Sequence, residues 1–264
     1  MKNPYQLTDV NGRGRFEEID MVRGIAILMM IIFHTLFDLY FFGLYPIDVT
    51  TGFWRYFAFT IASLFLLIVG ISLIISHARA VQNISKDNES ESIKILLKYF
   101  KRGAGIFGCG LLVTVATWFY LGEGFVIFGI LHLIGLSIIL APFFFRFKKN
   151  NVLIGVLCII IGIVLTSSGM NGSIFSLWLG IPPAPFYSVD YTPLFPWFGV
   201  VLIGMGIGEQ LYPNGKRSFS MPNVPEKLIS PFAFLGRHSL IIYLIHQPIL
   251  ITILHIFTGV PLFG

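Results

Sequence analysis

The feature that most constrains this chain is the succession of apolar runs along it. Seven runs are long enough, or nearly so, to cross a bilayer as helices of about 20 residues. They are Ile19–Phe42, Phe53–Ser76, Leu96–Tyr120, Phe125–Phe145, Asn151–Ser168, Pro193–Leu211 and Phe232–Phe257. Of the 264 residues, 55% are hydrophobic and only 12% are charged, which is typical of polytopic membrane proteins. The sequence therefore predicts an all-α membrane helix bundle of about seven transmembrane helices.

Lys and Arg are concentrated in alternate connections between these runs. The N-terminal tail and the second-to-third, fourth-to-fifth and sixth-to-seventh connections carry nearly all of them, and Arg55 is the exception. The positive-inside rule then places the N-terminus in the cytoplasm and the C-terminus outside. We expect a cytoplasmic tail (1–18) and a single transmembrane domain (19–264) in a multi-pass protein of the cell membrane. Because the charges are spread over four loops, a nucleic-acid partner is not expected.

Cysteines and glycines inside the runs indicate packing. Cys109 and Cys158 have no disulfide or metal-ligand spacing and are interpreted as small buried apolar residues. Glycines recur within the third to sixth runs, where close helix contact explains them better than a phosphate-binding loop. The long outer connection, Ser168–Pro193, is rich in aromatic residues, Pro and Gly. It is interpreted as an interfacial aromatic belt, with a lid over a substrate site as the alternative.

The first apolar run contains three ionisable residues on one helix face. Arg23 and His34 are separated by three helical turns plus about 20°, or roughly 16 Å along the axis. Asp38 follows one turn beyond His34 on the same face. Ionisable residues inside a membrane are costly and mark functional sites by default. A carboxylate at this spacing would orient the His34 imidazole as a general base.

Other polar residues are expected in the outer half of the bundle or near it. His132 and His246 lie at depths that allow three imidazoles to converge with His34, and no metal site is predicted. The alternative for His132 and for Gln247 is an interhelical hydrogen bond, a common use of polar side chains in membranes. His238 is interpreted as a support for the inner end of its helix. Further residues, His77 and His255, are interpreted as interfacial.

The separation of Arg23 from His34 suits an extended cofactor. Arg23 is expected at the inner interface, where a guanidinium holds anionic groups well. Coenzyme A thioesters carry nucleotide phosphates at one end and a reactive group at the end of a long arm. Arg102 and Arg237 are candidates to supplement the phosphate site, although ordinary positive-inside residues are the alternative for both.

Several segments resemble one known family. They are FEEIDMVRGIAILMMIIFHTLFDL (16–39), FGILHLIGLS (128–137), DYTPLFPWFGVVLIGMGIG (190–208) and FLGRHSLIIYLIHQPIL (234–250). Together they are similar to the heparan-α-glucosaminide N-acetyltransferase catalytic-domain family. This family is related to the acyltransferase-3 membrane enzymes, whose first span carries Arg or Lys, ten residues and then His. Arg23 and His34 occupy those positions.

The resemblance implies acyl transfer across a membrane. Cytoplasmic acetyl-coenzyme A is the expected donor, and an amine or hydroxyl of a sugar or glycan on the outer side is the expected acceptor. In a short prokaryotic-type version the acceptor is expected to be another glycan or a lipid-linked sugar. The resemblance also suggests a homodimer. The resemblance leaves open whether the acceptor is N- or O-acylated. It also leaves open whether transfer is direct or passes through an acyl-histidine intermediate.

These expectations assign a role to each candidate residue. Arg23, with Arg102 and Arg237, binds coenzyme A, and His34, oriented by Asp38, acts as base or acyl carrier. His132 and His246 stabilise the oxyanion or position the thioester. Asp190 engages a cationic amino sugar at the outer mouth, with Gln247 as a second substrate-binding residue.

Two alternative functions use the same residues. A proton-coupled transporter or flippase would use the His34–Asp38 pair as a proton relay. A bis-histidine haem protein would draw its axial ligands from His34, His132 and His246.

Overall fold

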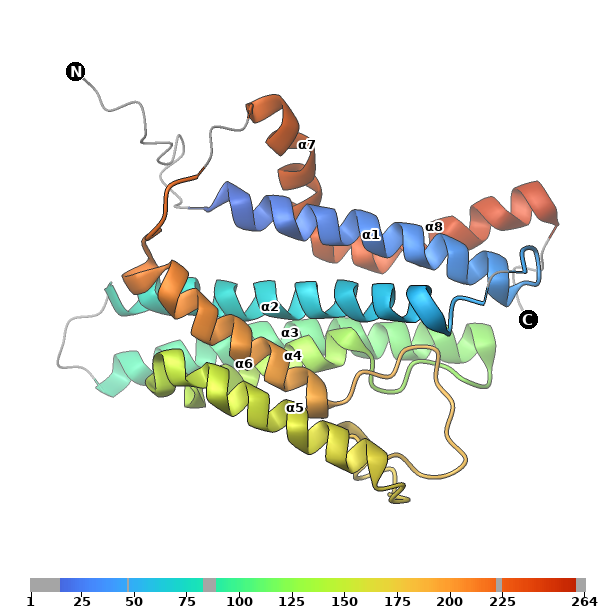
Figure 1. The fold of residues 1–264 in the computed structure, drawn as a ribbon, viewed down its shortest axis with the longest axis horizontal. Coiled ribbons are helices and arrows are strands. Elements are labelled where there is room, and N and C mark those ends of the chain that lie inside the picture. The colour runs from blue at the N-terminus through green and yellow to red at the C-terminus, as the bar shows by residue number, and fades with distance from the viewer. Residues whose placement is uncertain (1–14, 47, 83–88, 222–224, 260–264) are drawn as a thin grey trace.

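The computed structural model is built from helices (Figure 1). It describes residues 15–46, 48–82, 89–221 and 225–259, with side chains from residue 93 onward in the third of these ranges. The α-helices in this part of the chain are α1 (Glu17–Phe41), α2 (Gly52–Gln82), α3 (Glu89–Leu121), α4 (Ile130–Leu140), α5 (Asn151–Ser167), α6 (Leu194–Leu211), α7 (Glu226–Arg237) and α8 (Ser239–Thr258). Most of the expected tail (1–18) lies outside the described residues, and α1 begins at Glu17.

Within the described residues, six helices are long and apolar enough to cross a membrane. The fourth predicted run, Phe125–Phe145, instead forms the 11-residue helix α4, extended by a short 3₁₀ turn, η1 (Ala141–Phe143). Its first residues are not helical, because 124–128 pair with 189–192 of the connection Ser168–Pro193 through backbone hydrogen bonds. Figure 1 nevertheless shows α3 and α5 running in the same direction, so α4 carries the chain back between them.

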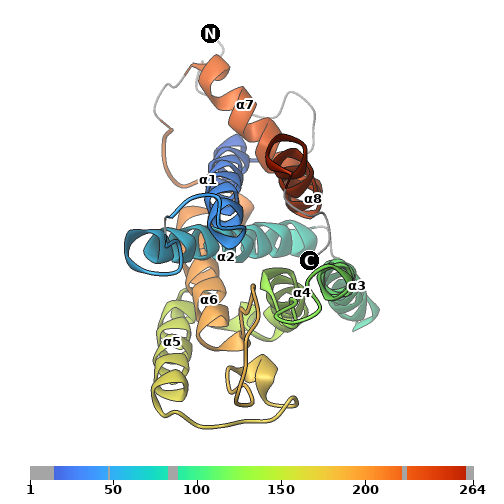
Figure 2. The same cartoon turned by 90° about the vertical axis from the view of Figure 1, so that its right-hand side faces the viewer.

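The seventh predicted run is divided into two helices. The sequence indicates one helix over Phe232–Phe257, but α7 ends at Arg237 and α8 starts at Ser239. His238, at the junction, has φ −104° and ψ 15°, which departs from helical geometry. The break allows α7 to cross the start of α1 while α8 runs beside the rest of that helix (Figures 1 and 2).

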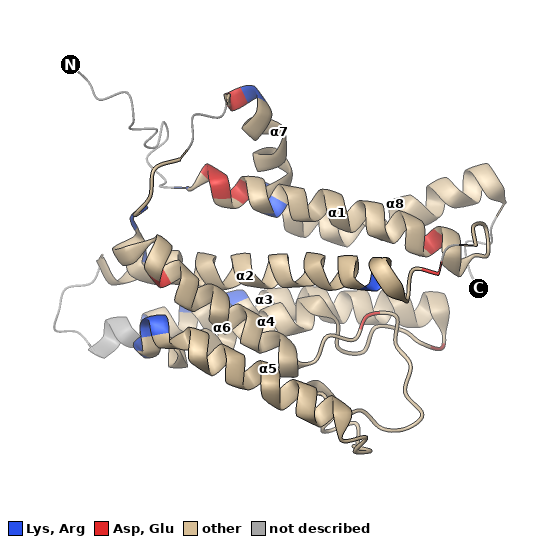
Figure 3. Ribbon diagram, in the orientation of Figure 1, with Lys and Arg blue, Asp and Glu red and all other residues tan. Residues whose placement is uncertain are grey.

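Basic side chains gather at one end of the bundle. Figure 3 shows Lys and Arg mainly at the end where α1 begins and α5 starts. Arg55 is the exception already evident in the sequence, since it lies in the first turn of α2 at the opposite end. The alternation inferred from the sequence is therefore preserved in three dimensions.

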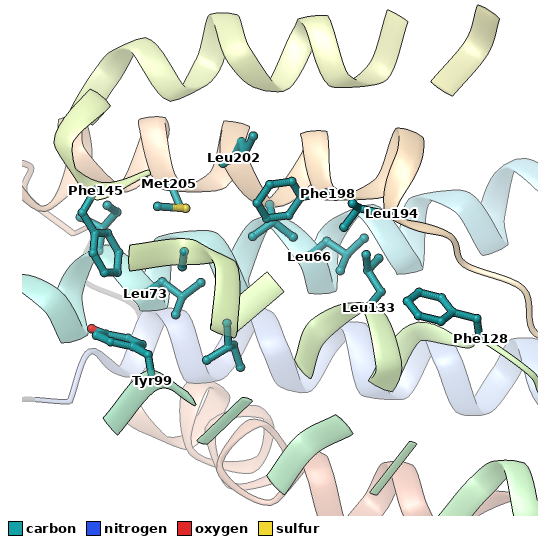
Figure 4. Close-up of a cluster of buried hydrophobic side chains, with 14 of the residues drawn as sticks. Leu66, Leu73, Tyr99, Phe128, Leu133, Phe145, Leu194, Phe198, Leu202 and Met205 are labelled. Atoms are coloured by element: carbon teal, nitrogen blue, oxygen red, sulfur yellow. The ribbon is translucent and has the colours of Figure 1, made fainter. Parts of the chain in front are cut away.

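The main apolar core lies among α2, α4 and α6. Its labelled members in Figure 4 include Leu66, Leu133, Phe198 and Leu202, all nearly inaccessible to solvent. A smaller cluster, around Ile27 and its neighbours, joins α1 to α2. Figure 2 shows α2 between α1 and α6, so α2 connects the α1–α7–α8 side of the molecule to the α5–α6 side.

Facing glycines allow the backbones to approach where helices cross. A Cβ atom at Gly199 of α6 would overlap the carbonyl oxygen of Gly155 on α5, and the reverse substitution would meet Gly199 in the same way. Gly103 and Gly135 face each other in the same way between α3 and α4. At the crossings of α2 with α6 (Gly70 and Gly204) and of α1 with α7 (Gly24 and Gly236), a Cβ atom on each glycine would overlap the backbone of the other helix. The predicted packing role is thus confirmed for most helix glycines. It is wrong for Gly105 and Gly108, which face open space among the described residues.

The glycine crossings yield a test of stability. Gly199→Ala should lower the free energy of unfolding by ~1–3 kcal/mol, because the methyl group would press on the α5 backbone. Gly105→Ala is the matched control and should leave the thermal unfolding temperature unchanged or slightly higher, because nothing described lies within 4 Å of its Cβ position. Thermal unfolding in detergent measures both variants, and equal destabilisation by the two would contradict the packing assignment.

Candidate active site

Arg23 is held in place near the start of α1. Its guanidinium donates hydrogen bonds to Asp20 Oδ1, at 3.0 Å, and to Ser72 Oγ of α2, also at 3.0 Å. Asp20 lies three residues earlier on the same helix, so this ion pair was readable from the sequence, whereas the contact with Ser72 was not. Arg102 of α3 lies within electrostatic range of Arg23. Arg237 is exposed at the end of α7, next to Gly236, which packs against Asp20.

A second ionic cluster at this end has no counterpart in the sequence analysis. Arg217 binds both carboxylate oxygens of Glu18, each at 2.7 Å, and Tyr212 donates to the same carboxylate at 3.0 Å. The bidentate geometry ties the start of α1 to the connection after α6. The two partners are 199 residues apart in the sequence, so no local pattern could have predicted the contact.

His34 and His246 meet between α1 and α8. Their ring centroids are 4.8 Å apart and the rings are nearly perpendicular. Nδ1 of His34 lies 2.9 Å from the Met30 carbonyl, and Nδ1 of His246 lies 2.6 Å from the Tyr243 carbonyl. Because a carbonyl oxygen only accepts, both Nδ1 atoms carry the proton, and the neutral rings each present a lone pair on Nε2.

Asp38 is bound to Gln247 rather than to His34. The Gln247 amide donates to Asp38 Oδ1 at 2.5 Å, and Asp38 is only 2% exposed. The expected orientation of His34 by Asp38 is therefore wrong, because the Met30 carbonyl performs that function. A direct proton relay between His34 and Asp38 also loses its geometric basis, since no hydrogen bond joins the two side chains.

His132 uses both ring nitrogens in the fold. Its Nδ1 accepts a hydrogen bond from the Gly129 amide at 3.2 Å, so the neutral ring carries its proton on Nε2, which lies 3.4 Å from Thr114 Oγ1. Gly110 of α3 leaves room for the ring, since a Cβ atom there would lie 2.9 Å from Nδ1. Among the described residues, His132 makes no ring contact or hydrogen bond with His34 or His246, and the interhelical alternative accounts for its contacts.

Asp190 also has a structural environment. Its carboxylate accepts hydrogen bonds from the Ile130 amide at 3.1 Å and from Thr192 Oγ1 at 2.8 Å, at the N-terminus of α4. Burial raises the pKa of this carboxyl, while the two hydrogen bonds and nearby His132 act in the opposite direction. An anion at a helix N-terminus is favourable, so Asp190 caps α4 rather than lining an open outer mouth.

The remaining histidines match their structural interpretations only in part. His238 Nδ1 lies 2.9 Å from the Phe234 carbonyl at the α7–α8 junction, in agreement with support of a helix end. His77 stacks on Phe145 with ring centroids 3.9 Å apart, so it packs between helices. The edge contact between His34 and His246 leaves no room for a flat macrocycle, which argues against a haem held by that pair.

In a comparison with protein-family models, residues 15–248 match the family described as "Heparan-alpha-glucosaminide N-acetyltransferase, catalytic". The curated proteins and the solved structures that were compared gave no match. The matched region includes both ends of the α1 site and the α8 residues that face it. The chain therefore belongs to the heparan-alpha-glucosaminide N-acetyltransferase catalytic family.

Proposed function

We propose that this membrane protein transfers an acetyl group from cytoplasmic acetyl-coenzyme A to an amine or hydroxyl of a sugar or glycan acceptor on the outer side of the cell membrane. The observation that carries the proposal is the arrangement along α1. A fixed arginine stands at the basic end, and an imidazole with a basic Nε2 stands roughly 16 Å away at about 1.5 Å per residue. The family match supports acetyl transfer.

The orientation follows from the distribution of charge. The basic end of the bundle is assigned to the cytoplasm, which puts the N-terminus inside and the C-terminus outside. With α4 counted as a short crossing, the chain passes seven times through the bilayer. Arg23 then faces the compartment that supplies acetyl-coenzyme A, and His34 lies nearer the outer side. Apolar side chains exposed on α3 and α5 suit contact with lipid or with a second copy in a homodimer.

The inner end of the site is assigned to the coenzyme A phosphates. Asp20 and Ser72 hold the Arg23 guanidinium in a defined position, and Arg102 adds a second positive charge from α3. Arg237 is assigned to the same end, as a more exposed contact. This placement leaves the pantetheine arm to run along α1 toward His34.

The chemistry is assigned to His34. Its Nε2 lone pair takes the proton from the attacking acceptor N–H or O–H as the new C–N or C–O bond forms. The thioester C–S bond breaks, and the coenzyme A thiolate leaves and takes up a proton. In a two-step route, the same nitrogen would first carry the acyl group. The neutral His246 ring offers Nε2 as a hydrogen-bond acceptor, not as a hydrogen-bond donor. It would therefore have to be protonated before it could stabilise an oxyanion.

Donor binding gives a first test. Acetyl-coenzyme A should raise the thermal unfolding temperature of the purified protein, because a ligand that binds only the native state stabilises it. Arg23→Ala should abolish most of this rise. Arg55→Ala, which removes an arginine at the other end of the bundle, should retain it. An equal rise in all three proteins would contradict the phosphate site at Arg23.

Catalysis gives a second test. Transfer of labelled acetyl groups to glucosamine in liposomes should fall by about 10²-fold or more in His34→Ala, since general bases contribute about 10²–10⁴-fold. Binding of acetyl-coenzyme A should persist in that variant. His255→Ala, near the far end of α8, serves as the control and should remain active. Full transfer activity in His34→Ala would rule out the assigned role.

A further inference from the structure

Three buried polar atoms on the residues around His34 have no hydrogen-bond partner in the described part of the chain. They are Asp38 Oδ2, Gln247 Oε1 and His246 Nε2. Asp38 and His246 are only 2% and 8% exposed. A buried polar atom left unsatisfied is costly, so several in one place indicate a missing partner. Tyr120 of α3 lies close enough to Asp38 to interact with it electrostatically, so a third helix borders the same place.

All three unsatisfied atoms are hydrogen-bond acceptors. The Gln247 amide nitrogen must face Asp38, because a carboxylate accepts, and this leaves Oε1 without a donor. His246 spends its Nδ1 proton on the Tyr243 carbonyl, which leaves the lone pair on Nε2. These three atoms can therefore be satisfied only by an occupant that supplies the hydrogens.

The position of these atoms relative to His34 suits the acceptor substrate. Asp38 lies one helical turn beyond His34, on the side away from Arg23. Under the proposed function, the acyl donor reaches His34 from the Arg23 side and the acceptor from the opposite side. The unsatisfied atoms thus lie on the side from which the acceptor substrate approaches His34.

We propose that Asp38, Gln247 and His246 form an acceptor-binding cradle that holds the sugar through its own O–H or N–H donors. This inference rests on the proposed function and assigns substrate recognition to residues that the reaction itself does not use. Asp38 and Gln247 are specificity-determining residues in this cradle. The Asp38 carboxylate binds an ammonium or hydroxyl group of the substrate. A substrate group that has lone pairs but no N–H or O–H binds poorly there.

Asp38→Asn tests the polarity of the cradle without changing its volume. The amide introduced at position 38 and the Gln247 amide can still form their mutual hydrogen bond, whichever of the two donates. In either case, one N–H group then takes the place of one of the oxygens that face the substrate. The KM for glucosamine should rise about 10- to 100-fold, because an amide N–H of the protein would then face an O–H or N–H of the sugar. The thermal shift with acetyl-coenzyme A should not change. Glu123→Gln, which removes an exposed carboxylate near the outer end, should leave both quantities unchanged.

Adding Gln247→Glu to Asp38→Asn should rescue binding. In the double variant the amide introduced on α1 donates to the carboxylate introduced on α8. The two oxygens left facing the site are then acceptors again, with the original total charge. The KM for glucosamine should return to within about threefold of the original value. A merely structural bond between α1 and α8 predicts no loss in the single variant. An unchanged KM there, or a folded double variant without rescue, would overturn the proposal.

Acceptor analogues provide a measurement that needs no variant. Replacing one hydroxyl of glucosamine by fluorine removes a donor and retains an acceptor. At least one of the 3-, 4- and 6-deoxyfluoro analogues should show about a 10-fold higher KM with the unaltered protein. Equal KM values for all of them and glucosamine would overturn the cradle while leaving acetyl transfer intact. Absence of both acetyl-coenzyme A binding and transfer would instead overturn the proposed function.

Discussion

The close crossing of α1 and α7 is the contact on which the candidate site depends. Gly24 lies against the backbone of Phe232, and Gly236 lies against the backbone of Asp20, so neither position accommodates a side chain without displacement. This contact fixes where α7 ends, and the break that follows turns α8 along α1. His246 then reaches His34, because the crossing determines the starting point of α8.

Backbone carbonyls, rather than acidic side chains, set the chemistry of the two central imidazoles. Each ring donates through Nδ1 to a carbonyl within its own helix, so the fold fixes the tautomer without placing a charge beside it. A neutral partner costs less to bury in a membrane than a carboxylate does. Asp38 is thereby left for a different role, paired with Gln247 on the side of His34 away from Arg23.

The polar residues divide into two groups by their degree of satisfaction. His132 and Asp190 have their hydrogen-bonding atoms engaged around the start of α4, which explains their burial in structural terms. The group around His34, in contrast, retains unsatisfied acceptors. From their positions in the apolar runs, His34 and His132 are expected at similar depths in the membrane. Only the contacts distinguish His132, whose ring nitrogens are both engaged, from the group around His34, which keeps unsatisfied atoms.

The sequence by itself determined the helical membrane class, the alternation of basic connections and the shared face of Arg23, His34 and Asp38, because these depend on local periodicity and composition. It also indicated glycine-mediated packing, though not which glycines face a partner. The tertiary structure decided that α4 is short, that the last run breaks at His238 and that Gln247 meets Asp38. Those outcomes depend on contacts between residues distant in the chain, such as Gly24 with Phe232, and single-sequence periodicity carries no information about them.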